Sequence, residues 1–540
     1  MEHNQTLAQR LDLPLRHGLP SWVGVVTMFL VAIPVMMING TYTGSIQEVS
    51  GTLGVLSEDI TMGYYAASAG MALVYPILNI VMGRVTQKTM LLIDLSLQAL
   101  VSWMCARTRS IDLLIIYSFV LGFLKGFAML WFVKKLSQLA SPNNVRSEFY
   151  AYFYPIVFSV GQLSMIVTAQ LAYYYDWKYM YYLEVILLLI ALTTVLATFR
   201  YAKRPMQSPF SGIDFRSIFI AGVSILMAMY VFTYGRTLDW FHSPRLRYYA
   251  VASILLMALF LWIQWARRNR SPYVHLIQIT RVKSLLGYLY MFITMFFCSS
   301  GTLITNYVTG IVRTDSVHAN TLYLYVIPGF VVGAFLCFWW FRWQRWRFRY
   351  FVSAGMFCFV AYFAIMYFGI APDSTYEMLY LPMFLRGLGM MILFISFGLF
   401  VVEELPLKYM MSNAFFLILS RSVLAPVIGS AFFSNMLYYL QQRGIQRLAE
   451  TVAMDNPIAA NQFGSSLNSA LAQGHGFMEA TQVATNAIYT TLQQQSLLLA
   501  MKTIMGYMVI AALVLAIASA FIPFHKTVKV KIIRTGNDMV

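Results

Sequence analysis

Apolar runs of about twenty residues recur along the whole chain, and this repetition constrains the fold more than any other feature of the sequence. A helix crossing about 30 Å of hydrocarbon needs roughly 20 apolar residues, and only helices and closed barrels satisfy their backbone polar groups in lipid. The sequence therefore predicts an all-α membrane protein. About fourteen spans are expected, with approximate bounds 22–44, 64–83, 89–106, 113–133, 149–173, 179–199, 218–235, 248–266, 285–308, 322–341, 351–370, 379–402, 410–436 and 499–521.

The composition agrees with a bilayer environment. Of the 540 residues, 59% are hydrophobic and only 11% are charged, whereas soluble domains carry about 25% charged residues. The net charge of +17 could suggest a nucleic-acid partner. Such a partner needs Lys and Arg gathered on one solvated face, however, and here they form short clusters between apolar runs. We therefore expect no nucleic-acid partner.

The sequence offers no motif for a metal, a cofactor or catalysis. Its four cysteines lie in apolar runs, far apart, without a C-x-x-C pair or metal-ligand spacing. It contains no H-E-x-x-H motif and no phosphate loop, which argues against an enzyme and against transport driven by ATP. The first apolar run is too long and too poorly bounded for a cleavable signal peptide. We therefore expect the first helix to remain in the mature protein as a membrane span, after a cytoplasmic segment of residues 1–20.

The distribution of Lys and Arg predicts the orientation. With both termini in the cytoplasm, about 25 basic residues fall inside and about 10 outside, as the positive-inside rule requires. This orientation suits a bacterial inner membrane. The inside clusters are Arg200/Lys203/Arg204, Arg267/Arg268/Arg270, Arg342/Arg345/Arg347/Arg349 and Lys526/Lys529/Lys531/Arg534, and the local exceptions are Arg107, Arg109, Arg236, Arg245 and Arg247.

A polar stretch separates the last two spans. Residues 437–495 are rich in Gln and Asn, and residues 480–495 carry apolar side chains at helical spacing. We expect a partly helical periplasmic excursion. The alternative is a long connection without a function of its own.

A short internal repeat predicts two related halves. Residues 124–129, LKGFAM, in the fourth span match residues 385–390, LRGLGM, in the twelfth. Repeats of this kind are typical of transporters built from two halves. The predicted organisation is a cytoplasmic segment 1–20, a six-helix half 21–200, an inserted helix pair 214–270, a second six-helix half 281–524 with a periplasmic excursion 437–498, and a basic cytoplasmic tail 525–540.

Ionisable residues at membrane depth are functional candidates, because burying a charge in hydrocarbon costs a few kcal/mol. Lys125 and Arg386 lie deep in their spans, each before a glycine, and suggest a role in substrate binding or conformational coupling. Arg421 has the same candidate role, with a structural salt bridge as the alternative. The remaining candidates are Asp94, expected to pair with the nearby basic loop, Glu184, Glu48 near the outer end of the first span, and Glu403 and Glu404 at the inner end of the twelfth.

Polar and helix-breaking residues add further candidates. Asn39, Tyr42 and Gln162 can line a cavity, although such residues equally often join helices to one another. Pro155, Pro328 and Pro426 mark expected bends in the fifth, tenth and thirteenth spans, where neighbouring groups can satisfy the freed backbone.

Three segments carry a resemblance to a known family. In the loop 79–88, Arg84 and Lys88 match the motif G-x-L-x-D-R-x-G-R-K, with Gly83 in place of its Asp. Residues 176–181, DWKYMY, look like the segment D-W-R-W-x-F, and residues 412–429 look like the conserved stretch of the next-to-last helix. The chain therefore resembles the fourteen-span drug:proton antiporter family of the major facilitator superfamily. This resemblance implies the major facilitator fold and a conformational role for the loop with Gly83, Arg84 and Lys88.

The chain also departs from this family at residues linked to proton coupling. Gly122 stands at the place of an Arg in the fourth span, and Lys125 stands one helical turn away on the same face. Gly161-Gln162 replaces a G-P pair in the fifth span, and an acidic residue usual near Asn39 is missing. The sequence is thus a divergent member by resemblance, whose proton chemistry cannot be carried over residue by residue.

Together these features predict a secondary active transporter, an antiporter that exports amphipathic, drug-like compounds by proton-coupled alternating access. The buried cations favour a substrate with an anionic group. The alternatives are an exporter of a specific lipid or metabolite without proton antiport, and a transporter fold retained as a membrane sensor or scaffold. The resemblance also implies a periplasmic adaptor and an outer-membrane channel as partners, besides protons and membrane lipids.

Overall fold

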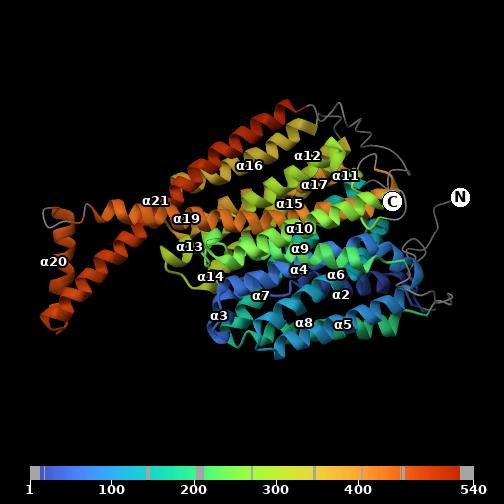
Figure 1. The fold of residues 1–540 in the computed structure, drawn as a ribbon, viewed down its shortest axis with the longest axis horizontal. Coiled ribbons are helices and arrows are strands. Elements are labelled where there is room, and N and C mark those ends of the chain that lie inside the picture. The colour runs from blue at the N-terminus through green and yellow to red at the C-terminus, as the bar shows by residue number, and fades with distance from the viewer. Residues whose placement is uncertain are drawn as a thin grey trace.

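The computed structural model describes residues 13–16, 19–141, 146–201, 212–268, 272–343, 348–402, 405–450, 452 and 456–522. The chain folds into helices that run side by side in one bundle (Figure 1). Its helices are α2 (Ser21–Met37), α3 (Ile46–Leu53), α4 (Ser57–Arg84), α5 (Gln87–Arg107), α6 (Ile111–Ala140), α7 (Arg146–Tyr174), α8 (Lys178–Thr198), α9 (Phe215–Tyr234), α10 (Pro244–Ala266), α11 (Ile277–Thr280), α12 (Val282–Cys298), α13 (Gly301–Gly310), α14 (Ser316–Thr321), α15 (Val326–Trp343), α16 (Phe348–Gly369), α17 (Tyr380–Val402), α18 (Met410–Ile418), α19 (Ala425–Ala449), α20 (Pro457–Ala472) and α21 (Phe477–Phe521).

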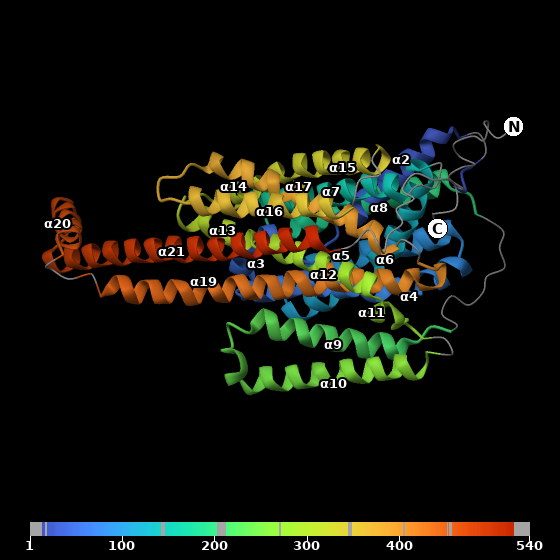
Figure 2. The same ribbon diagram turned by 90° about the horizontal axis from the view of Figure 1, so that it is seen from above.

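The helices confirm the all-α membrane fold. Thirteen of the described helical segments are long and apolar enough to cross a membrane, and α2 adds a fourteenth apolar helix of 17 residues. Two ends of the bundle can be distinguished in Figures 1 and 2. We call the end from which α20 projects the excursion end, and the other the opposite end.

Two predicted continuous spans are broken, which corrects the sequence-based expectation. The first span, predicted over 22–44, ends as α2 at Met37 and resumes only at a short 3₁₀ turn, Thr43–Ser45, followed by α3. The ninth, predicted over 285–308, is split into α12 and α13 at Ser299 and Ser300. Each break falls at a short polar sequence, Asn39-Gly40-Thr41 or Ser299-Ser300-Gly301, but the residues around it are apolar enough for the whole run to be predicted as one span.

Glycines allow two helix pairs to approach closely. A Cβ atom added to Gly122 of α6 would lie 1.8 Å from the carbonyl oxygen of Ala67 in α4. A Cβ atom on Gly387 of α17 would lie 2.4 Å from the carbonyl oxygen of Val326 in α15. Small residues let backbones of membrane helices touch in this way. The helix that carries Lys125, α6, is therefore in backbone contact with α4, and the helix that carries Arg386, α17, is in backbone contact with α15.

Gly122→Val is expected to lower the stability of the protein by about 1–3 kcal/mol or more, because the added side chain must push α6 away from the α4 backbone. Thermal unfolding in detergent measures this loss. Gly161→Val is the matched control, since a Cβ atom at Gly161 of α7 would meet nothing within 4 Å. Equal unfolding temperatures for the two variants would contradict the close packing.

The segment 214–270, predicted to be an inserted pair, contains the helices α9 and α10, which lie on the outside of the bundle (Figure 2). The two helices are joined by reciprocal hydrogen bonds, in which each hydroxyl of Ser224 and Ser253 donates to the other's carbonyl at 2.9 Å. In the connection between the two helices, Trp240 donates to Asn435 of α19 at 3.0 Å. In the segment after α10, the hydroxyl of Tyr273 donates to the Leu73 carbonyl of α4.

The polar stretch before the last span forms a helical projection. The helices α19 and α21 contact each other and continue beyond the bundle, and α20 lies at the far end of this projection, packed against α21 (Figure 1). The described residues of this stretch, predicted to be partly helical, are largely helical, and α21 runs unbroken for 45 residues from the projection into the bundle.

Several residues of the predicted clusters lie outside the described residues. These include the tail 525–540, most of 1–20, and the side chain of Arg342. The other residues are Lys203, Arg204, Arg270, Arg345, Arg347, Glu403, Glu404, Lys526, Lys529, Lys531 and Arg534.

Candidate functional site

Lys125 of α6 is anchored at the break in the first span. Its Nζ donates to the carbonyl oxygens of Ile38 at 2.5 Å and Met36 at 3.1 Å, and lies 3.4 Å from Oδ1 of Asn39. Carbonyls at the end of a helix have no partner within that helix and carry partial negative charge. The ammonium group of Lys125 therefore stabilises the end of α2.

Glu184 of α8 meets the same region from the other side. Its side chain is 1% exposed, and its carboxylate interacts electrostatically with Lys125 and with the hydroxyl of Tyr42. One carboxylate oxygen has no hydrogen-bond partner. Tyr42 follows the break and packs against Tyr181, with ring centroids 5.7 Å apart. The structure thus brings together Asn39, Tyr42, Lys125 and Glu184 from three separate spans.

Arg386 of α17 has the corresponding position in the second predicted half. Its Nη2 donates to the carbonyl oxygen of Cys298, the last residue of α12, at 2.6 Å. Its guanidinium group lies 5.6 Å from the ring centroid of Tyr323. In both cases a cation on one helix satisfies carbonyls at the break of another, which explains why each break is tolerated in an apolar environment.

Arg421 lies in a π-helical segment, η6 (Leu419–Leu424), between α18 and α19. Such segments are rare and occur frequently at functional sites. The Nη1 of Arg421 donates to the hydroxyl of Tyr154 in α7 at 3.3 Å. Its guanidinium group also lies 5.5 Å from the ring centroids of Tyr154 and Phe394.

The surroundings of Arg421 are aromatic rather than acidic. Tyr154 stacks with Tyr150 at 5.3 Å, and Phe158 contacts Phe394 edge-on at 5.0 Å. Within the described ranges no carboxylate lies within 4.0 Å of Arg421, so the predicted alternative of a structural salt bridge receives no support. Arg421 is half-buried, and a cation at membrane depth without a counter-ion is costly. This site is therefore suited to an external anion.

Three predicted candidates lie elsewhere. The carboxylate of Asp94 in α5 accepts a hydrogen bond from Gln98, one turn further on, at 2.9 Å, while its other oxygen has no partner. Its expected pairing with the basic loop is therefore replaced by a pairing within its own helix. Glu48 lies on α3 and accepts a hydrogen bond from Ser316 of α14 at 2.6 Å. Gln162 is half-buried on α7.

The loop that resembles the family motif lies at the opposite end. Lys88 is 2% exposed, and its Nζ donates to the carbonyl oxygen of Phe199 at 2.6 Å, beyond the last residue of α8. Gly83 is exposed, and Arg84, half-buried, ends α4. Lys88 thus connects the start of α5 to the end of α8 by a hydrogen bond.

Contacts join the two predicted halves at both ends of the bundle. At the excursion end, Asn320 of α14 donates to the carbonyl oxygen of Gly44 at 2.7 Å, near the Glu48–Ser316 contact. At the opposite end, Arg146 of α7 donates to the carbonyl oxygen of Val402 at 2.7 Å. Sequence reasoning missed Arg146 and Tyr154, because each contacts a residue more than 250 positions away and neither stands in a motif.

Comparison with known proteins gives one family. The sequence family described as Major Facilitator Superfamily matches residues 26–430. Among curated proteins, the chain is similar to the Probable multidrug resistance protein EmrY of Escherichia coli (strain K12), at 21% identity over 245 residues, or 45% of this chain and 47% of that protein. The chain thus matches about half the length of this relative.

Three solved structures are similar in fold. The first is the nucleoside transporter NupG, with a TM-score of 0.48 and 10% identity over 88% of this chain and 98% of that chain. The human organic anion transporter MFSD10 (TETRAN) has a TM-score of 0.48 and 10% identity over 89% and 100%. An auto inhibited POT family peptide transporter has a TM-score of 0.49 and 12% identity over 96% and 98%.

Proposed function

Because this chain belongs to the Major Facilitator Superfamily, and is therefore a secondary transporter of the membrane rather than an enzyme, we propose that it exports amphipathic, drug-like compounds by proton-coupled alternating access. The proposed substrates carry an anionic group. One observation carries this proposal: Arg421 lies between α7 and α17 among aromatic rings, without a carboxylate partner in the described part of the chain.

The arrangement of Arg421 suits an amphipathic anion. The guanidinium group has five N–H donors, and its Nη1 donates to the hydroxyl of Tyr154. The rings of Tyr154, Phe158 and Phe394 supply an apolar surface beside it. An anionic head can thus bind the cation while an apolar body packs on the rings, and binding would relieve the cost of an unpaired charge.

The proposed proton site is the pair Glu184 and Lys125. Both side chains are held near the break after α2, and the Glu184 carboxylate has an oxygen free to bind a proton. A change of charge on Glu184 alters its attraction for Lys125, and Lys125 stabilises the end of α2. Proton binding can thus bias the conformation of the first span. Asn39 and Tyr42 complete this proposed site. Roles in coupling are also proposed for Asp94, Glu48 and Gln162, and they are supported only by the positions of these residues in the membrane.

Alternating access is proposed to occur between the halves 21–200 and 281–524, with α9 and α10 as an inserted pair. Rocking of two such halves about a central site is the general mechanism for transporters built in this way. The hydrogen bonds Ser316–Glu48 at one end and Arg146–Val402 at the other would break alternately. We also propose that the opposite end faces the cytoplasm of a bacterial inner membrane, as the basic clusters indicate.

Reconstituted vesicles with an imposed pH gradient test the function. The panel would contain fatty acids, bile salts and lysolipids as anions or zwitterions, and neutral and cationic dyes of similar apolar area. We expect uptake into inside-acidic vesicles for anionic members, and proton release on substrate addition. Transport that is indifferent to the pH gradient would favour an exporter of one lipid or metabolite without proton antiport. Binding without any transport would favour a sensor or scaffold.

The projection of α19, α20 and α21 is proposed to bind a periplasmic adaptor that leads to an outer-membrane channel. The outer part of this projection can be deleted without moving the helices below it, because α19 and α21 are close together at Gly444 and Ser496. A Cβ atom on Gly444 of α19 would lie 3.0 Å from Ser496 Cβ in α21. Joining these two residues through a short Gly/Ser turn removes the outer projection and leaves the bundle unchanged.

This shortened variant is expected to transport normally in vesicles and to lose efflux from whole cells about tenfold, because an adaptor is needed only where a second membrane must be crossed. Uptake in vesicles and drug sensitivity of cells measure the two effects. The control replaces Gln462 and Thr491, which hydrogen-bond at 2.7 Å within the projection, by alanine. Unchanged efflux from cells that carry the shortened variant would refute an adaptor at this site.

A further inference from the structure

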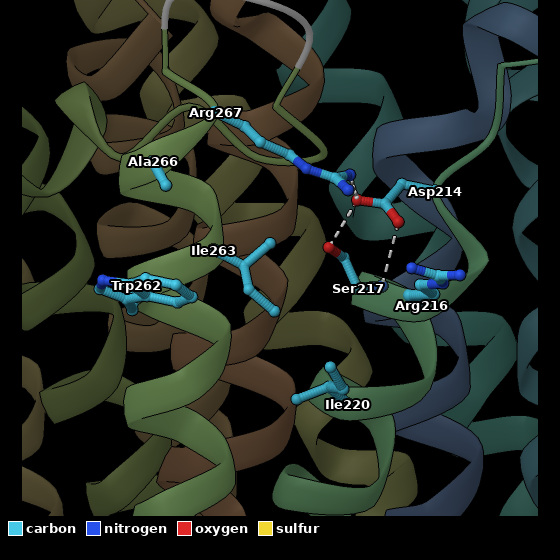
Figure 3. A pocket seen from close by; sticks show the side chains of 8 residues that line it. All are labelled: Asp214, Arg216, Ser217, Ile220, Trp262, Ile263, Ala266 and Arg267. Carbon is cyan, nitrogen blue, oxygen red and sulfur yellow. Dashed lines mark hydrogen bonds and ion pairs between the residues drawn. The ribbon is translucent and has the colours of Figure 1, made fainter.

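A pocket lies between α9 and α10 at the opposite end of the bundle, and none of the candidate site residues described above lines it. It has a volume of about 300 Å³ and is lined by the first residues of α9 and the last residues of α10 (Figure 3). The volume is at the lower limit of ordinary ligand sites. Arg216 and Arg267 are the two cations in its wall, and Asp214 is the one acid.

Asp214 is already fully engaged. Its carboxylate forms an ion pair with Arg267 at 2.5 Å, and it caps α9 by accepting hydrogen bonds from the hydroxyl of Ser217 at 2.7 Å and from the Ser217 backbone at 3.3 Å (Figure 3). These bonds fix the position of Arg267, whose Nη1 alone contacts the acid. Two guanidinium groups against one carboxylate leave one net positive charge in the pocket.

Arg216 supplies the cation that has no acid. Its side chain is exposed and forms no ion pair in the part of the chain that the structure describes. It lies beside Asp214 at the rim of the pocket (Figure 3). Arg216 and Arg267 line the same pocket on either side of Asp214 (Figure 3), and guanidinium groups are well matched to phosphate oxygens.

The pocket opens where lipid headgroups are expected. Trp262 in its wall is 61% exposed, and Trp265, one turn further along α10, is 58% exposed. Tryptophan is enriched at the membrane–water interface. Only 17% of an apolar 18-residue stretch of α10 is buried inside the protein, the lowest share among the described membrane-spanning helices. The outer face of this helix therefore contacts acyl chains, and a ligand of the pocket can extend along it.

We propose that this pocket binds the headgroup of an anionic phospholipid. The phosphate contacts Arg216 and Arg267, the glycerol backbone lies against Trp262 and Ile263, and the acyl chains follow the exposed face of α10. Basic pockets between membrane helices on the cytoplasmic side bind anionic headgroups in this manner. The bound lipid would fasten the inserted pair, which contacts the rest of the bundle mainly through α9. This site is independent of the transported substrate.

Native mass spectrometry of the full-length protein, titrated in detergent with phosphatidylglycerol or phosphatidylcholine, tests the proposal. The wild type is expected to bind one phosphatidylglycerol about tenfold more tightly than phosphatidylcholine. Arg216→Ala should abolish this preference, and Arg216→Lys should restore part of it. The matched control is Arg245→Ala, an exposed arginine at the other end of α10, which should bind as the wild type does.

Three results would overturn the proposal. The first is an unchanged preference in Arg216→Ala, and the second is equal binding of the two lipids by the wild type. The third is displacement of the lipid by millimolar inorganic phosphate, which would identify a site for a free phosphate instead. Because Arg216 is exposed, its variants should unfold at the wild-type temperature, and this measurement confirms that a loss of binding is local.

Discussion

Arg421→Ala is expected to lower the transport of an anionic amphipathic substrate by about tenfold to a hundredfold. A hydrogen bond to a charged group contributes about 1.5–3 kcal/mol, and 1.4 kcal/mol corresponds to a factor of ten. Arg421 is the cation that lies among the rings of Tyr154 and Phe394 without an acid. Removing it leaves the aromatic surface but no partner for the anionic head.

The substrate panel separates binding from folding in this variant. Neutral dyes should lose less than a few-fold in transport, because they depend on the rings and not on the charge. Arg421→Lys should fall between wild type and alanine, since lysine keeps the charge but not the planar set of donors. Arg443→Ala on α19, which removes another arginine over a tyrosine ring, at 4.3 Å, is the control. An equal loss for neutral and anionic substrates would show that Arg421 has a structural role.

Lys125→Met is expected to destabilise the protein by roughly 3–5 kcal/mol, because it leaves the buried Glu184 carboxylate without its cation. It also removes the donor to the carbonyls of Met36 and Ile38 at the break of the first span. Thermal unfolding in detergent measures the loss of stability. Transport coupled to the pH gradient should be lost as well, since the proposed proton site includes this pair.

A double-mutant cycle isolates the interaction. Glu184→Gln removes the charge of the partner, so the double variant Lys125→Met/Glu184→Gln should be more stable than Lys125→Met alone, by about 1–3 kcal/mol. Lys134→Met, on the same helix, replaces an exposed lysine that contacts Asn79 at 3.1 Å, and should change little. Additive effects of the two substitutions at 125 and 184 would contradict an interaction between them.

The sequence was sufficient for the membrane fold and for naming most of the charged candidates. Hydropathy is a property of a local stretch of chain, so a run of twenty apolar residues indicates a span whatever the rest of the protein does. The short repeat around Lys125 and Arg386 was also informative, because both cations prove to satisfy carbonyls at the break of another helix. Neither signal required knowledge of which helices are neighbours.

Only the tertiary structure decided how those candidates are grouped. The break after Met37 and the break after Cys298 fall at short polar sequences inside otherwise apolar runs, and each is stabilised by a cation that comes from a different helix. Glu184 meets Lys125, while Arg421 meets Tyr154 rather than an acid. The physical reason is that the partner of a buried charge depends on helix packing between residues far apart in the chain, whereas the sequence records only that the charge is there.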